Sequence, residues 1–169
     1  MEISIETLPN QHVLASARAF YNAAKMLHDE KFINVEIPVL VNSAFALELY
    51  LKSFNSKKIF QNGKLNNEGI AIYEEVVNKP NTTGHNLADL YSAISDEIKQ
   101  VIKSEYLENE SFENGIIEFN NIFIEYRYSF ERRNKGVNLT KMFSILKTLE
   151  NVAVALEKKA KSNKRGRMD

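Results

Sequence analysis

Apolar residues recur along most of the chain at the three- and four-residue spacing that places them on one face of a helix. This spacing predicts a first helix over about residues 10–30 and a second over about 37–55, with Pro38 suited to its first turn. Further helices are predicted from Asn86 to about 102, from about 110 to 134, and from Asn138 to about 160. The second helix is apolar almost all round, which is typical of a helix in the middle of a bundle.

The segment from 55 to about 84 interrupts this pattern. Its stretches NSKKIFQNGKLNNEG and NKPNTTG are rich in Asn, Gly and Lys and predict loop, with a short helix in IAIYEEVVN between them. No strand pattern competes, so the sequence predicts an all-α fold, an up-and-down bundle of four to five helices. A connection this long is unusual in a compact bundle and is a candidate carrier of function. Residues 1–160 are expected to form one helical domain, and 161–169 a basic, flexible tail.

Composition removes several classes of function. The chain has 22 basic and 22 acidic residues, so no overall charge draws it to nucleic acid or to a membrane. It has no cysteine, and its three histidines are isolated, so disulfides and the common metal motifs are not expected, nor is a cofactor. No stretch has the length of a membrane span and the N-terminus does not resemble a signal peptide, so we expect a cytoplasmic protein.

Two charged residues fall where the helical pattern predicts burial. Glu48 lies within the apolar arc of the second helix, where a carboxylate requires a partner, and Lys52 lies one turn further on. Arg127 borders the apolar stripe of the fourth helix beside Tyr128, where a guanidinium can stack on rings and bind a carboxylate or a phosphate. Either these residues form a structural tie across the core, or Glu48 and Arg127 line a polar pocket.

His85 directly precedes the predicted start of the third helix. Asn86 and Asp89 have the spacing of a capping box, and Leu90 lies where a hydrophobic staple would contact His85. The alternative is an imidazole at the mouth of a polar cleft. The basic residues after position 157 could contact phosphates through charge alone, although a solvated tail is the simpler interpretation.

Three segments together resemble the HEPN superfamily of helical, often dimeric proteins: NSAFALELYLK (42–52), GHNLADLYSAI (84–94) and FIEYRYSFE (123–131). The resemblance spans most of residues 10–157. It implies a bacterial or archaeal intracellular protein linked to RNA cleavage, toxin–antitoxin pairs or phage defence, or a non-catalytic relative that binds a nucleotide or a partner. Catalytic members of the superfamily carry an arginine and a histidine, commonly as RNxxxH, which act on the RNA phosphate and the 2′-hydroxyl.

This sequence departs from the catalytic pattern. RNKGVN (133–138) has Asn138 where histidine is expected, and asparagine cannot exchange protons near neutral pH. We therefore expect a degenerate, non-catalytic HEPN-like module that forms a homodimer through its helical faces and binds RNA, a nucleotide or a partner protein encoded nearby. A second hypothesis is an active, metal-independent endoribonuclease that uses Arg127 with Glu131 or His85. A third is a purely structural, antitoxin-like interaction bundle.

Overall fold

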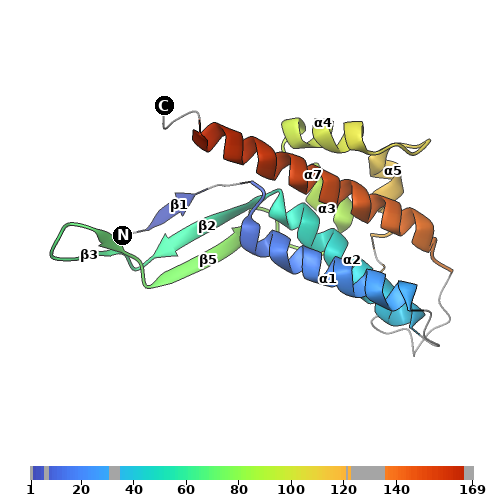
Figure 1. Ribbon diagram of the computed structural model, residues 1–169, viewed down its shortest axis with the longest axis horizontal. Coiled ribbons are helices and arrows are strands. Elements are labelled where there is room, and N and C mark those ends of the chain that lie inside the picture. Colours follow the sequence, from blue (N-terminus) through green and yellow to red (C-terminus); the bar gives the residue numbers. More distant parts are fainter. Residues whose placement is uncertain (1, 6–7, 31–34, 121, 123–135, 166–169) are drawn as a thin grey trace.

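The computed structural model describes residues 2–5, 8–30, 35–120, 122 and 136–165. Its helices form one body, from which the strands project as an arm (Figure 1). The long helices α1 (Gln11–Asp29), α2 (Glu36–Ser53) and α7 (Leu139–Arg165) pack against one another. The shorter helices α3 (Leu87–Ser92), α4 (Asp96–Glu105) and α5 (Phe112–Ile117) pack on α2 and α7.

Asparagine side chains cap the N-termini of several of these helices, as the sequence predicts for Asn86 and Asn138. The Asn10 side chain accepts hydrogen bonds from the backbone N–H groups of His12 and Val13, and Asn138 accepts one from Lys141 at 3.0 Å. These bonds satisfy N–H groups that have no partner inside a helix. The predicted first and second helices are confirmed within two residues at each end, and α7 continues beyond its predicted end at 160 to Arg165.

Helix α2 lies at the centre of the core, as its apolar surface predicts. It contacts α1, α3 and α7, and Leu47, Tyr50 and Leu51 on it are fully buried. Leu14 and Ala17 of α1 and Leu146 and Leu149 of α7 belong to the same apolar cluster. Because the hydrophobic effect scales with the apolar area removed from water, the burial of this central helix stabilises the helical body.

An ion-pair network ties α1 to α7. The Arg18 guanidinium contacts the Glu150 carboxylate at 3.0 Å and binds Glu157 through two hydrogen bonds of 3.2 and 3.0 Å. The Tyr50 hydroxyl donates to Glu150 at 2.7 Å, which connects α2 to the same network. These hydrogen bonds raise the pKa of Arg18, and the bond from Arg18 lowers the pKa of Glu157.

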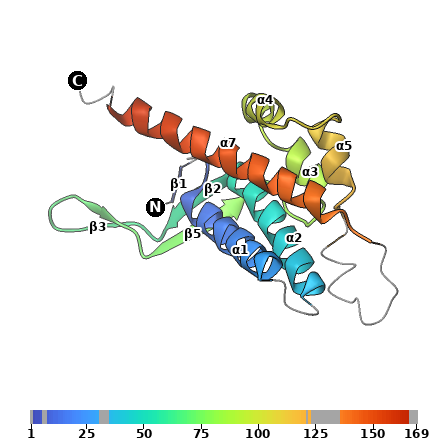
Figure 2. The same cartoon turned by 45° about the vertical axis from the view of Figure 1, so that its right-hand side comes forward.

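The prediction of an all-α fold is wrong, because the described residues include two antiparallel sheets. Strands β1 (Ile3–Ile5), β2 (Ser56–Gln61) and β5 (Glu75–Pro80) form one sheet in the order β1-β2-β5. Strands β3 (Lys64–Leu65) and β4 (Ala71–Ile72) pair near the end of the arm. Figure 2 shows the arm extending away from the helices, with β3 far from the body. The segment IAIYEEVVN, in which a short helix was predicted, instead contains β4 and the beginning of β5.

The predicted third and fourth helices are each interrupted. Helix α3 ends at Ser92, and α4 begins after Ser95, whose extended backbone turns the chain before the acidic first turn of α4. Helix α5 ends at Ile117, and residues 118–120 form a turn. The remainder of the predicted fourth helix, residues 123–134, lies outside the described residues.

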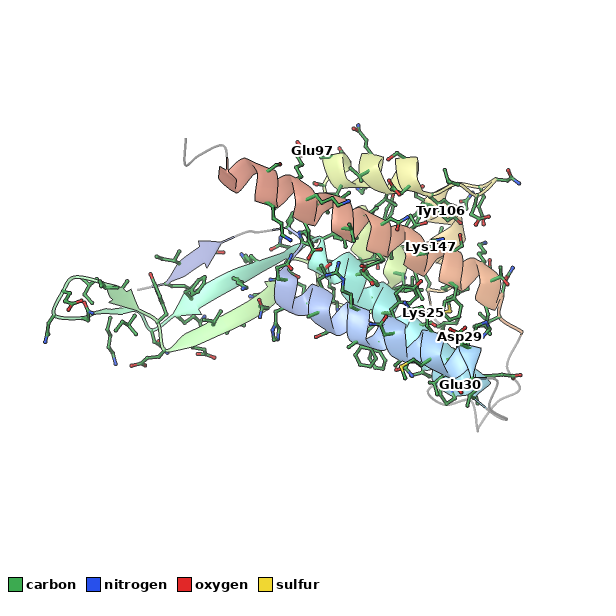
Figure 3. The ribbon with its side chains drawn as sticks, in the orientation of Figure 1. Lys25, Asp29, Glu30, Glu97, Tyr106 and Lys147 are labelled. Atoms are coloured by element: carbon green, nitrogen blue, oxygen red, sulfur yellow. The ribbon has the colours of Figure 1, made fainter. Side chains whose placement is uncertain are left out.

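Tyr106 follows α4 and lies beside α5 and α7 (Figure 3). Its ring packs edge-on against Phe112, with ring centroids 5.2 Å apart. Its hydroxyl is buried and has no hydrogen-bond partner among the described residues. A methyl group at Gly115 would approach this oxygen within 2.6 Å, so the glycine provides space for the tyrosine.

Candidate functional site

A buried carboxylate on α2 holds two nitrogen groups from different parts of the chain. The Lys52 ammonium donates to Glu48 Oε1 at 2.5 Å. The His85 Nδ1 lies 3.0 Å from both carboxylate oxygens of Glu48. We call these three residues the Glu48 cluster. Its members lie near the end of α2 and just before α3.

Local structure on both sides fixes this arrangement. Glu48 and Lys52 lie one turn apart on the same face of α2, in the favoured order for an ion pair. His85 lies directly before Asn86, whose side chain caps α3 by accepting from the Asp89 N–H at 3.0 Å. The Ala88 N–H donates to the Asn120 side chain at 2.8 Å, which anchors the start of α3. The start of α3 therefore positions the His85 ring beside Glu48.

The return from the arm to the body is also held in place. The backbone N–H of Asn81 donates to the carbonyl of Asn55 at 2.9 Å, and the Asn55 amide donates to the Thr82 hydroxyl at 3.3 Å. Asn55 follows the end of α2, and Thr82 lies on the segment that leads to His85. The backbone around His85 is therefore connected to the end of the helix that carries Glu48.

The members of the cluster differ sharply in exposure. The side chains of Glu48 and Lys52 are 8% and 15% exposed, whereas that of His85 is 58% exposed. A buried carboxylate is costly unless it is paired and hydrogen-bonded, so Glu48 is stabilised by its two partners. Because a carboxylate accepts hydrogen bonds, the contact at Nδ1 assigns the proton of the neutral His85 ring to that nitrogen.

This geometry permits two kinds of chemistry. A solvent-exposed imidazole held by a carboxylate can bind an anion when it is protonated or exchange a proton when it is neutral. The Lys52 ammonium has three N–H donors, and its hydrogen bond to Glu48 uses one. With a protonated His85 the cluster carries a net charge of about +1, which favours an anionic ligand.

The structure brings together three of the residues singled out from the sequence. Glu48 and Lys52 form the predicted pair, and His85 joins them through its ring nitrogen. The Nδ1 atom of the His85 ring contacts Glu48, and the staple interpretation, in which His85 packs on Leu90, stays a prediction. Arg127, Tyr128 and Glu131 lie outside the described residues, so the proposed contact of Arg127 with Glu48 stays a prediction.

Sequence reasoning did not identify the network of Arg18, Tyr50, Glu150 and Glu157. These residues come from three helices, and 132 positions separate Arg18 from Glu150. A single arginine on the polar side of a predicted helix gives no signal of such a pairing. Burial raises the pKa of the Tyr50 phenol, and its bond to Glu150 adds to the effect. The network holds α1, α2 and α7 together, and its Tyr50 lies between Glu48 and Lys52 on α2.

A pocket of about 460 Å³ lies among α3, α4 and α5 and does not include the Glu48 cluster. Its charged lining residues pair with one another, Lys103 with Glu113 at 3.1 Å and Lys99 with Asp96 at 3.7 Å. The Tyr91 hydroxyl also donates to Glu113, at 3.3 Å. The charges in the lining of this pocket therefore neutralise one another in pairs.

The described residues contain no group of three or more His, Cys, Asp and Glu side chains arranged to hold a metal ion. Across the same part of the chain, no helix combines the length and the apolar character needed to cross a lipid bilayer. In comparisons with known proteins, no protein-family model, no curated protein and no solved structure matches this chain.

Proposed function

We propose that the chain is a non-catalytic, HEPN-like module that binds a phosphate of RNA or of a nucleotide at the Glu48 cluster. The resemblance in the sequence supplies the family, the cytoplasmic location and the setting in a toxin–antitoxin or phage-defence system. The observation that carries the proposal is the binding of His85 and Lys52 to one buried carboxylate. All three residues lie within the segments on which the resemblance rests.

The support is electrostatic and geometric. Phosphate groups are bound by ammonium and imidazolium groups, and a ligand site is more effective when its side chains are already oriented. Glu48 orients both nitrogen groups before any ligand arrives, so little side-chain freedom is lost on binding. The exposed ring of His85 gives a ligand access to the cluster.

A second candidate function is metal-independent cleavage of RNA. The specific observation in its favour is the carboxylate–imidazole pair, because a carboxylate that orients a histidine is a common arrangement for acid–base catalysis. In this hypothesis His85 or Glu131 exchanges a proton with the 2′-hydroxyl, and Arg127 stabilises the phosphate. The absence of histidine at position 138 favours binding over cleavage.

Binding is tested by fluorescence anisotropy with a labelled single-stranded RNA, using Lys52→Met and His85→Ala. We expect both variants to bind more weakly than the unmodified protein. For Lys52→Met the slope of log affinity against log salt should fall by about 0.7, the value for one lost phosphate contact on a single strand. Circular dichroism at the assay temperature establishes that each variant is folded.

Lys64→Met is the matched control, because it removes the same charge from the exposed arm, where Lys64 pairs with Glu74. Equal losses for Lys52→Met and Lys64→Met would show non-specific attraction and would reject the site.

Separation of the RNA products on a gel decides between the two functions. Cleavage that Arg127→Ala abolishes in a folded protein would support the ribonuclease, and an intact RNA supports binding alone.

A further inference from the structure

Strand β5 leaves a long edge of the arm open. It pairs with β2 on one side only, because the sheet order is β1-β2-β5. In Figures 1 and 2 its outer edge runs beside no described helix except toward its C-terminal end, where the Asn10 side chain at the start of α1 donates to the Asn78 side chain at 3.0 Å. An exposed edge offers unpaired N–H and C=O groups to another strand, and proteins usually cover or interrupt such edges. Pro80 interrupts this edge only at its last residue.

The backbone register shows which groups face outward. The Asn81 N–H donates to the Asn55 carbonyl, so residues 55 and 81 form a hydrogen-bonded pair. Hydrogen-bonded pairs alternate along an antiparallel ladder, so Val77 opposite Ile59 points its backbone groups toward β2. The N–H and C=O groups of Val76 and Asn78 therefore point away from β2, toward the open edge.

The sequence of β5 is complementary to itself when two copies run antiparallel. With a two-fold axis at Val77, each Val76 lies opposite Asn78 of the second copy, and their outward backbone groups can pair. The same register places each Glu75 opposite Lys79 of the second copy. A register shifted by two residues in one direction would place Glu75 opposite Val77 of the second copy, and a shift in the other direction would place Lys79 there. Only the register centred on Val77 pairs the two opposite charges.

Within the part of the chain that the structure describes, Glu75 and Lys79 have no oppositely charged partner. Neither Glu75 nor Lys79 takes part in an ion pair among the described residues, and both are exposed. Lys79 lies opposite Lys57 in the ladder with β2, and Glu75 lies opposite Gln61. Like charges directly opposite one another repel, so a Glu75 carboxylate from a second copy would offset the repulsion between Lys79 and Lys57.

We propose that β5 is a self-association surface that pairs with β5 of a second copy of this chain, antiparallel about a two-fold axis at Val77. The pairing joins the sheets of two arms into one sheet and leaves the Glu48 cluster of each copy in the helical body. It differs from a dimer through the helical faces, which the family resemblance implies. Edge-to-edge pairing buries a small area, so the dimer is weak and depends on protein concentration.

Sedimentation equilibrium of the full chain tests the pairing through charge reversal. Glu75→Lys and Lys79→Glu each convert both cross-strand attractions to repulsions, and we expect each to raise the dimer dissociation constant at least about tenfold. An equimolar mixture of the two variants should form a heterodimer, because each Lys then faces a Glu again. The double variant with both reversals should dimerise like the unmodified chain.

Glu68→Lys is the matched control, since it makes the same charge change at an exposed position in the turn between β3 and β4. It should leave the dimer intact. A chain that stays monomeric at high concentration would overturn the proposal. A dimer that both single reversals leave unchanged would also overturn it and would point to the helical faces.

Discussion

Replacing Glu48 with glutamine removes the charge at the centre of the cluster while keeping its shape. The carboxylate accepts from Lys52 at 2.5 Å and from His85 at 3.0 Å. Glutamine has one acceptor oxygen, and its amide group would direct donors at one of these two nitrogen groups. The Lys52 side chain, only 15% exposed, would be left without an anionic partner.

The expected loss follows from these exposures. A hydrogen bond to a charged group contributes about 1.5–3 kcal/mol, and the Lys52 bond is shielded from water. His85 is 58% exposed and regains water as a partner, so its contribution is small. We expect Glu48→Gln to lower the free energy of unfolding by about 2–3 kcal/mol. For a chain of this size this corresponds to a fall in Tm of roughly 4–12 °C.

Urea unfolding followed by circular dichroism measures this loss. Glu74→Gln is the matched control, because Glu74 pairs with Lys64 on the exposed arm, where their side chains are 56% and 75% exposed. An exposed pair contributes at most about 1 kcal/mol. Adding Lys52→Met to Glu48→Gln should recover part of the lost stability, since it removes the stranded ammonium. Equal effects of Glu48→Gln and Glu74→Gln would refute the reasoning.

The remaining predictions concern packing and pH. Gly115→Ala places a methyl group 2.6 Å from the Tyr106 hydroxyl, so we expect thermal unfolding to show a loss of about 1–3 kcal/mol. Tyr106→Phe should restore most of it, and no recovery would argue against the clash. Arg18 lowers the pKa of Glu157 in the folded state, so its contribution is present near neutral pH and is lost as the pH falls below about 4. Arg18→Gln should therefore lose less stability on acidification than the unmodified chain, and parallel pH profiles would contradict this.

The features that depend on residues close together in sequence could be predicted from the sequence. The caps at Asn86 and Asn138 were predictable because each bonds an N–H three residues further on. The Glu48–Lys52 pair was predictable for the same reason, since one helical turn joins its members. The partnership of Glu48 with His85 spans 37 positions and exists only after α2 and α3 have packed. No spacing rule along the chain could have identified it.

The strands were not predicted because the Asn, Gly and Lys content of residues 55–84 was given more weight than the strand-like patterns in the sequence. EISIE at the N-terminus alternates apolar and polar residues, and SKKIFQ and EVVNKP contain the β-branched and aromatic residues typical of strands. The neighbouring Asn, Gly and Lys residues favoured a loop instead. The break between α3 and α4 had its own signal, since Ser95 is followed by Asp96 and Glu97, a frequent start of a helix.

The central claim, that the Glu48 cluster binds a phosphate, is tested most directly by nuclear magnetic resonance of the histidine rings. The chain has three histidines, His12, His28 and His85, so single substitutions assign every ring signal. When single-stranded RNA is added at low salt, the account predicts that the ring signals of His85 shift while those of His12 and His28 stay in place. RNA that binds without moving the His85 signals, or that does not bind at all, would contradict it.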